Sequence, residues 1–108
     1  MKIIKQFSNN LKEKRPGVLV NSITGKNAQM LYIKLNPGTS TLHNHSQEQM
    51  GFILSGSAEI TINGKSVICE PGDAYYIPSN ANHGFKVLNN TNLEYIEIFS
   101  PAKEENIL

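Results

Sequence analysis

The chain has 108 residues, of which 39% are hydrophobic and 18% are charged, and we expect a single domain over residues 1–108. The balance of 10 basic and 9 acidic residues gives a net charge of +1, which offers no electrostatic footprint for nucleic acid or an acidic membrane. The single cysteine, Cys69, excludes an internal disulfide framework and a zinc site built on cysteines. No apolar run approaches membrane-spanning length and no signal-peptide pattern is present, so we expect a cytoplasmic protein with no membrane or nucleic-acid partner.

The predicted elements are short strands separated by turn residues. The charged run at residues 12–15 ends at Pro16-Gly17 and is interpreted as a solvated turn. Asn63-Gly64 lies between two runs of alternating apolar residues and predicts a type I′ hairpin, because both residues tolerate positive φ. Short helices have room at the N-terminal end and near residues 102–106. The predicted strands span residues 18–23, 30–35, 50–54, 58–62, 66–69, 74–77, 84–88 and 93–99.

Many short strands with turns at this spacing predict an all-β fold, either a small antiparallel barrel or a sandwich. Among the aromatic residues, one of Tyr75 and Tyr76 is expected to face the interior, since neighbouring strand residues point to opposite faces. Met30 and Phe52 are expected to fill the interior, and Cys69 to lie in the core.

The three histidines are the first candidates for chemistry. His43 and His45 form an H-x-H pair, and on a strand side chains two positions apart share a face, so both could reach one metal ion. Imidazole is a good ligand for several transition metals. Taken alone, the pair favours an interpretation as two exposed strand histidines, because isolated motif matches are weak.

The surroundings of the pair resemble the first sequence motif of the cupin superfamily. In that motif a glycine precedes H-x-H, and a further ligand and a second glycine follow. Here these positions are Gly38, His43, His45, Gln49 and Gly56.

The second cupin motif is also present, farther along the chain. Gly72, Pro78 and His83 occupy their usual positions. Asn80 replaces the second glycine of this motif, and asparagine also tolerates left-handed backbone geometry. Val87 replaces a final asparagine that is not a metal ligand.

The cupin resemblance implies a jelly-roll barrel, or double-stranded β-helix, with a core over about residues 28–100. Residues 1–27 would form an N-terminal strand or arm. The resemblance also implies one divalent transition metal, which could be Ni, Zn, Fe or Mn. The implied metal ligands are His43, His45, Gln49 and His83.

Gln49 departs from the family, which usually has glutamate at this position. A neutral amide leaves the charge of the metal uncompensated, which favours Lewis-acid chemistry or an anionic substrate. It argues against an iron oxygenase site of two histidines and a carboxylate. Alternatively, Gln49 is a polar residue lining the sheet, with Glu48 or water on the metal, although Glu48 points to the opposite strand face.

Strand alternation near the C-terminal end puts Tyr95, Glu97 and Phe99 on one face and Ile96 and Ile98 on the other. From spacing alone, a solvated outer face is favoured for Glu97. The alternative is a carboxylate at the mouth of a cavity, where it could act as an acid or base.

Nearly the whole chain resembles the pectin-degradation cupins, which linearise unsaturated uronates. Their typical ending, Asp-x-Phe-Ser-Pro-x-Arg, corresponds here to Glu97, Phe99, Ser100-Pro101 and Lys103. The resemblance implies that Glu97 moves a proton, Phe99 packs on the sugar and Lys103 attracts the substrate carboxylate. Lysine cannot reproduce the two-pronged grip of arginine on a carboxylate.

This resemblance implies an enzyme that opens the ring of a 4,5-unsaturated uronate, a sugar acid, to its linear keto form. It also implies a homodimer in which the N-terminal strand of a partner covers a sheet edge. Two alternatives stay open: a sensory or ligand-binding cupin without turnover, and a metal-dependent dioxygenase or isomerase of another small molecule.

Overall fold

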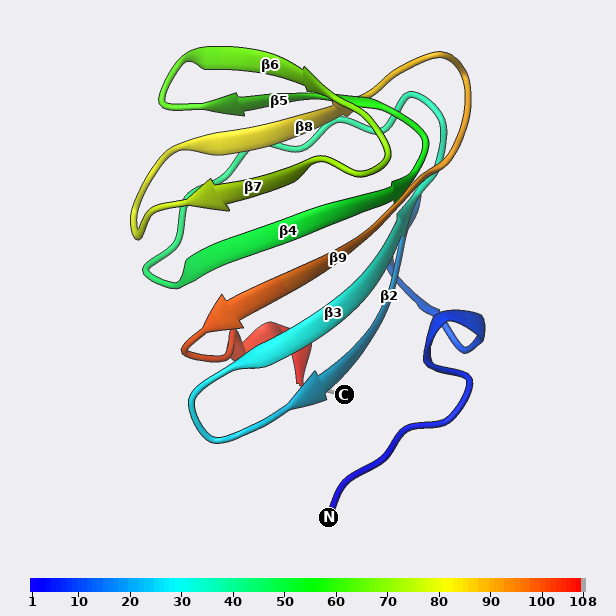
Figure 1. The fold of residues 1–108 in the computed structure, drawn as a ribbon, viewed down its shortest axis with the longest axis vertical. Helices are drawn as coiled ribbons and strands as arrows, with labels where there is room; N and C mark the ends of the chain where they lie inside the picture. The colour runs from blue at the N-terminus through cyan, green and yellow to red at the C-terminus, as the bar shows by residue number, and fades with distance from the viewer. Residues whose placement is uncertain (108) are drawn as a thin grey trace.

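The fold consists of antiparallel strands in two sheets. The computed structural model describes residues 1–107. One sheet has the strand order β1-β2-β3-β9-β4-β7 and the other the order β6-β5-β8 (Figure 1). The all-β fold predicted from the sequence is therefore confirmed. The strands are β1 (Lys12–Arg15), β2 (Val18–Thr24), β3 (Gln29–Leu35), β4 (Glu48–Ser55), β5 (Ala58–Ile62), β6 (Lys65–Cys69), β7 (Ala74–Ile77), β8 (His83–Val87) and β9 (Leu93–Ser100).

Each strand predicted from the sequence is present, but the interpretation of residues 12–15 as a solvated turn is wrong. These residues form β1, whose backbone pairs with β2 while most of its charged side chains stay exposed. A strand at a sheet edge tolerates such a charged composition. Short 3-10 helices lie at both expected places, η1 at Phe7–Asn9 and η2 at Glu104–Asn106. Within residues 1–107, neither helix has the length and hydrophobicity needed to cross a bilayer.

Asparagines hold two of the turns that the sequence analysis singled out. Asn63 and Gly64 have φ values of 49° and 82° and join Ile62 to its partner Lys65, so the predicted hairpin is confirmed. Asn80, at the position of a motif glycine, has a φ of 65°. The substitution is therefore compatible with the left-handed turn that glycine would make.

The core lies between the two sheets, and alternate residues of β2, β3 and β9 point into it. Cys69 is buried among these residues, as predicted. Burial of their apolar surface is the main force that stabilises the fold. The larger sheet contributes Val18, Val20, Leu31, Ile33, Leu35, Ile53, Ile77, Leu93, Tyr95 and Phe99, and the smaller sheet contributes Ala58, Ile60, Cys69, Phe85 and Val87.

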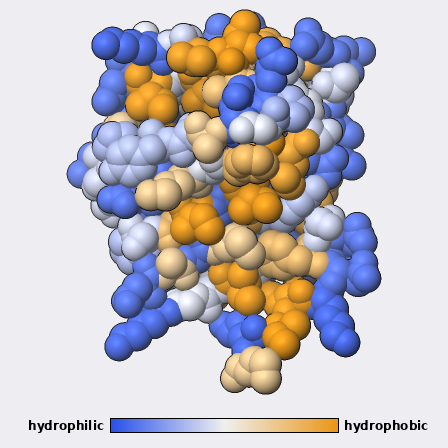
Figure 2. All heavy atoms as spheres, in the orientation of Figure 1, coloured by the Kyte–Doolittle hydropathy of each residue, from blue (hydrophilic) through white to orange (hydrophobic). Residues whose placement is uncertain are grey.

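Part of the outer face of the larger sheet is apolar. Met50 and Phe52 of β4 are 50% and 44% exposed, and Ile98 of β9 lies beside them. Figure 2 has the orientation of Figure 1 and shows hydrophobic side chains gathered near the middle of the molecule, where Figure 1 draws β3, β9 and β4. The prediction that Phe52 fills the interior is wrong, because Gln49 points inward and strand alternation turns Phe52 outward. Met30, paired with Ile98, is half-buried on the same outer face, so the prediction that it fills the interior is also wrong.

Candidate metal centre

The three histidines lie together, although His83 is distant from the other two in sequence. Donor atoms of His43, His45 and His83 are within 4.8 Å of one another. Two backbone hydrogen bonds of 2.8 and 2.9 Å join His43 to His83 at the start of β8. The prediction that H-x-H lies on a strand is only partly confirmed. His43 forms an isolated β-bridge with His83, whereas His45 lies in the irregular segment before β4. Backbone pairing between the two motifs therefore assembles the cluster.

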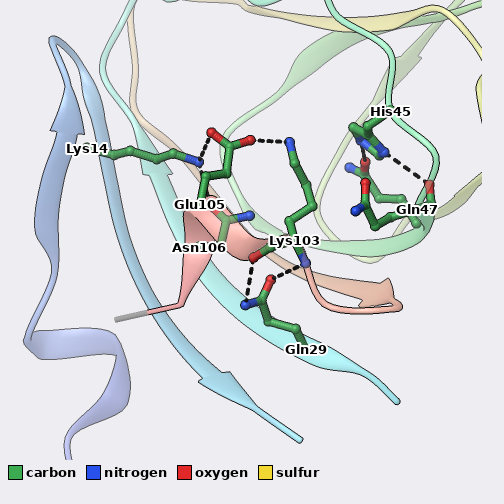
Figure 3. A network of polar contacts seen from close by, with 8 residues as sticks. Lys14, Gln29, His45, Gln47, Lys103, Glu105 and Asn106 are labelled. Carbon is green, nitrogen blue, oxygen red and sulfur yellow. Dashed lines mark hydrogen bonds and ion pairs between the residues drawn. The ribbon is translucent and has the colours of Figure 1, made fainter. Parts of the chain in front are cut away.

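Backbone carbonyls fix the orientation of two imidazole rings. His45 Nδ1 lies 3.0 Å from the carbonyl oxygen of Gln47 (Figure 3), and His83 Nδ1 lies 2.9 Å from that of Ala81. A carbonyl oxygen only accepts, so each Nδ1 carries the hydrogen and each Nε2 keeps its lone pair. His83 Nε2 is buried, and no residue in the described part of the chain gives it a hydrogen-bond partner. Such a nitrogen is a natural metal ligand.

Gln49 reaches the cluster from β4. Its side chain is 2% exposed, and its amide nitrogen donates a hydrogen bond to the carboxylate of Glu97. This contact turns the amide oxygen towards His45, where it lies 3.0 Å from Nε2. Two electron-pair donors thus face each other, an arrangement that a bound cation stabilises. Glu48, the neighbouring alternative, is exposed on the opposite face of β4.

The environment of all three imidazoles favours their neutral form. Burial is the largest cause, and it lowers the pKa of His43 to about 4, with the nearby charges of His83 and Lys103 acting in the same direction. Burial also lowers the pKa values of His45 and His83. Because neutral imidazole is the form that binds metals, the cluster can accept a divalent cation at neutral pH.

Glu97 points into the barrel beside the cluster. Its side chain is 4% exposed and accepts hydrogen bonds from the Tyr75 hydroxyl, at 2.5 Å, and from the Gln49 amide. Burial raises the pKa of Glu97 to about 7, although both hydrogen bonds oppose this rise. The alternation predicted for β9 is confirmed, with Tyr95, Glu97 and Phe99 on one face. The solvated outer face favoured by spacing alone is wrong, because this face is the one that points inward.

Tyr75 is the inward-facing member of its tyrosine pair, as expected, but its contact with Glu97 was not predicted. The strand register places Gly51 opposite both Tyr75 and Glu97. A Cβ atom at Gly51 would lie 2.1 Å from the phenol ring, so glycine leaves the space through which Tyr75 reaches Glu97. A glycine inside a strand, which marks such close approaches, was the available signal.

Phe99 and Lys103 border the same small cavity as Glu97 and two of the predicted metal ligands, His43 and Gln49. The cavity has a volume of about 50 Å³. The ring centroid of Phe99 lies 5.4 Å from that of His45, and Lys103 Nζ lies 5.6 Å from the Phe99 centroid. The structure therefore places the three residues predicted to contact substrate at one cavity.

Two cations from β1, Lys14 and Arg15, also border this cavity, and the sequence analysis missed them. Arg15 and Lys103 further border an open groove of about 460 Å³ outside the cavity. Lys14 contacts Asn106, which is 92 positions away, so no local sequence pattern records the approach of β1. Three cations therefore border one cavity, and Glu105 forms ion pairs with two of them, Lys14 and Lys103.

Comparison with known proteins identifies the family. Residues 31–99 match the cupin domain family. The chain is a cupin. The matched span runs from β3 to β9 and contains all three histidines and Gln49. The superfamily predicted from the two motifs is thus confirmed.

Solved cupin structures share the fold over almost the whole chain. KdgF from Halomonas sp. has a TM-score of 0.89 and 22% sequence identity, with 99% of each chain covered. An RmlC-like cupin from Shewanella frigidimarina has a TM-score of 0.86 and 19% identity, with 98% of this chain and 94% of that chain covered. The jelly-roll form of the predicted fold is therefore confirmed.

Two relatives have higher sequence identity over shorter spans. The oxalate-binding protein of Thermotoga maritima is 35% identical over 68 residues, which cover 61% of this chain and 56% of that protein. An acireductone dioxygenase of Bacillus thuringiensis is 36% identical over 62 residues, which cover 53% of this chain and 36% of the enzyme. The chain thus spans little more than half of the first relative and about a third of the second. Together with the histidine cluster, these similarities support a metal-binding cupin.

Proposed function

We propose that this cupin is a metal-dependent enzyme that opens the ring of a 4,5-unsaturated uronate and yields its linear keto form. The observation that carries the proposal is the buried Glu97 carboxylate beside three histidines and an amide. The substrate class follows from the resemblance of residues 97–103 to the ending of pectin-degradation cupins. The reaction belongs to uronate catabolism.

The donor set fits one divalent transition metal, with Ni, Zn, Fe and Mn as the candidates. All four donors are neutral, so a bound ion keeps its full charge. Such an ion supplies Lewis-acid polarisation of a substrate oxygen. The buried Nε2 of His83 and the facing donors of His45 and Gln49 support this fit.

The proposed ring opening moves one proton and leaves the composition of the sugar unchanged. The bond between the anomeric carbon and the ring oxygen breaks, and the anomeric hydroxyl loses its proton as it becomes an aldehyde. The ring oxygen becomes an enol oxygen, and the carbon–carbon double bond takes up a proton as the enol becomes a ketone. No electrons leave the sugar, so no redox cofactor is required.

Each of four residues at or beside the cavity has its own role in this reaction. Glu97 moves the proton, since its buried carboxyl group lies at the cavity. Tyr75 is a positioning residue that holds the Glu97 carboxylate through its hydroxyl. Phe99 packs against the sugar, and Lys103 attracts the substrate carboxylate.

Turnover of the unsaturated uronate tests the proposal. Proton NMR of 4,5-unsaturated galacturonate should show the vinyl signal disappearing faster with the metal-loaded protein than in buffer. Protein treated with a chelator is the control and should act no faster than buffer. Equal rates with and without the loaded protein would contradict the proposal.

A small-anion binding protein without turnover is the second candidate. The similarity to an oxalate-binding protein favours it, as does a cavity of about 50 Å³, which suits a few water-sized groups better than a sugar. Saturable binding of oxalate without turnover of the uronate would support this candidate. A dioxygenase is disfavoured by Gln49, which replaces the carboxylate of the usual iron site, and oxygen uptake with a substrate would test it.

We further propose that residues 1–108 form one domain that works as a homodimer in the cytoplasm. The exposed apolar side chains of Met50, Phe52 and Ile98 support an interface with a second copy. The buried thiol of Cys69 agrees with a reducing compartment. Sedimentation equilibrium measures the oligomeric state directly.

A further inference from the structure

The C-terminal segment folds back towards β1 and is anchored by its backbone. The Gln29 side chain bonds the N–H and C=O groups of Lys103, at 3.2 and 3.3 Å (Figure 3). The Ser22 hydroxyl donates to the backbone carbonyl of Asn106, whose side chain is buried. Between these anchors, the Glu105 side chain is 53% exposed. The backbone is therefore held in place while the Glu105 carboxylate retains freedom to move.

The Glu105 carboxylate bridges two lysines that border the cavity. Glu105 Oε1 lies 2.6 Å from Lys103 Nζ, and Oε2 lies 3.4 Å from Lys14 Nζ (Figure 3). Both lysine side chains are mostly buried, with exposed fractions of 20% for Lys14 and 15% for Lys103. Each carboxylate oxygen thus faces its own lysine, which is the arrangement in which two ammonium groups would hold the carboxylate of a ligand.

We propose that Lys14 and Lys103 form the carboxylate-binding site of this cupin, and that Glu105 occupies the site until a ligand carboxylate displaces it. The choice of a uronate as the ligand rests on the proposed function. Lys103 alone is a point charge and cannot match the two-pronged grip of arginine, whereas Lys14 supplies a second donor from β1. The groove of about 460 Å³ bordered by Arg15, Lys103 and Glu105 gives the sugar its way in.

This arrangement makes Glu105 a competitor of the ligand. A carboxylate that enters the groove restores the contacts that Lys14 and Lys103 lose when Glu105 leaves. A neutral sugar restores neither contact, so it leaves Glu105 in place. Glu105 therefore selects for carboxylate ligands.

Calorimetric titration with D-galacturonate, a uronate without the reactive double bond, tests this inference on the full-length protein. We expect Glu105→Gln to bind galacturonate about two- to fivefold more tightly than the wild type. The gain is small because a half-exposed ion pair contributes little free energy. Glu104→Gln makes the same change in net charge one residue away, and its affinity should equal that of the wild type. Lys14→Met should weaken binding by about fivefold, and urea unfolding checks that each variant is folded.

Several results would overturn the inference. They are unchanged or weaker galacturonate binding by Glu105→Gln, an equal gain in Glu104→Gln, and absence of binding in all four proteins. An equal gain for the neutral sugar D-galactose would also contradict it, because Glu105 would then not select for a carboxylate. Galacturonate binding as expected, without turnover of the unsaturated uronate, would contradict only the enzymatic proposal.

Discussion

The two faces of β4 and β9 carry opposite chemistry. Inward, Gln49 and Glu97 are almost fully buried and hydrogen bonded to each other. Outward, Met50, Phe52 and Ile98 are apolar and exposed. A sheet with one solvated face ordinarily buries its apolar side and exposes its polar side. At these five positions the order is reversed, which supports the proposed reaction on the inner face and the proposed homodimer contact on the outer face.

Removal of a predicted metal ligand on the inner face gives the largest expected effect. We expect His83→Ala to lose its metal, from about one ion per chain to a small fraction, because a structurally fixed imidazole donor disappears. The backbone bonds between residues 43 and 83 do not need the imidazole, so the fold should persist. Elemental analysis and circular dichroism measure the two properties. Asn44→Ala, an exposed position between the other two histidines, should keep its metal, whereas full occupancy in His83→Ala would remove this residue from the site.

Two glutamates of β9 allow a direct comparison of the inner and outer faces. Glu97 points inward, while Glu94 points outward and accepts a hydrogen bond of 2.8 Å from the Tyr32 hydroxyl. We expect Glu97→Gln to lower kcat for uronate ring opening by about 100-fold or more, with metal content unchanged, because the proton-moving group is lost. Glu94→Gln is the matched control and should leave kcat unchanged. Similar kcat values for Glu97→Gln and the wild type would argue that another group moves the proton.

A charge on the outer face should act on association alone. We expect Phe52→Lys to weaken the proposed homodimer by about tenfold or more, because it places an ammonium group in an apolar contact. Val67→Lys makes the same kind of change at an exposed apolar position of β6 in the other sheet, and should leave association unchanged. Sedimentation equilibrium measures both. Equal dimerisation of the two variants would locate the interface elsewhere.

The ion pair at the cavity opening should have the smallest effect, less than about 1 kcal/mol of stability, because Glu105 is half-exposed. The hydrogen bond from Lys103 lowers the pKa of Glu105 to about 2, from an ordinary value of 4.5. Its stabilising contribution is therefore present above pH 4.5 and is lost as the pH falls towards 2. The difference in free energy of unfolding between the wild type and Glu105→Gln, from urea titrations, should shrink over this interval. A difference that grows on acidification would contradict this account.

The inner site was largely predictable because motif spacing reflects barrel geometry. The residues named from the two motifs, His43, His45, Gln49 and His83, do lie close together. Their binding of a metal stays a prediction. Alternation also separated the two faces of β9 correctly, although it did not say which one points inward. Ile96 and Ile98 are as apolar as the aromatic residues on the other face, so composition could not decide.

The rest of the site depends on contacts that no local pattern records. β1 is rich in charge, and its pairing with β2 uses backbone groups that are the same in every sequence. Lys14 lies on β1 and Glu105 lies near the C-terminal end, so the two side chains make contact only in the folded barrel. Phe52 was expected inside because large apolar residues usually are. Gln49 of the same strand points inward, however, and strand alternation then turns Phe52 outward.

The backbone bridge between His43 and His83 has a consequence for how this cupin would acquire the proposed metal ion. The bridge ties the two motifs through peptide groups, so the scaffold does not depend on a cation to stay closed. We therefore expect that one ion can leave and another take its place without refolding. We expect the element at the centre to follow its supply in the cell throughout the life of the protein, rather than at the moment of synthesis alone.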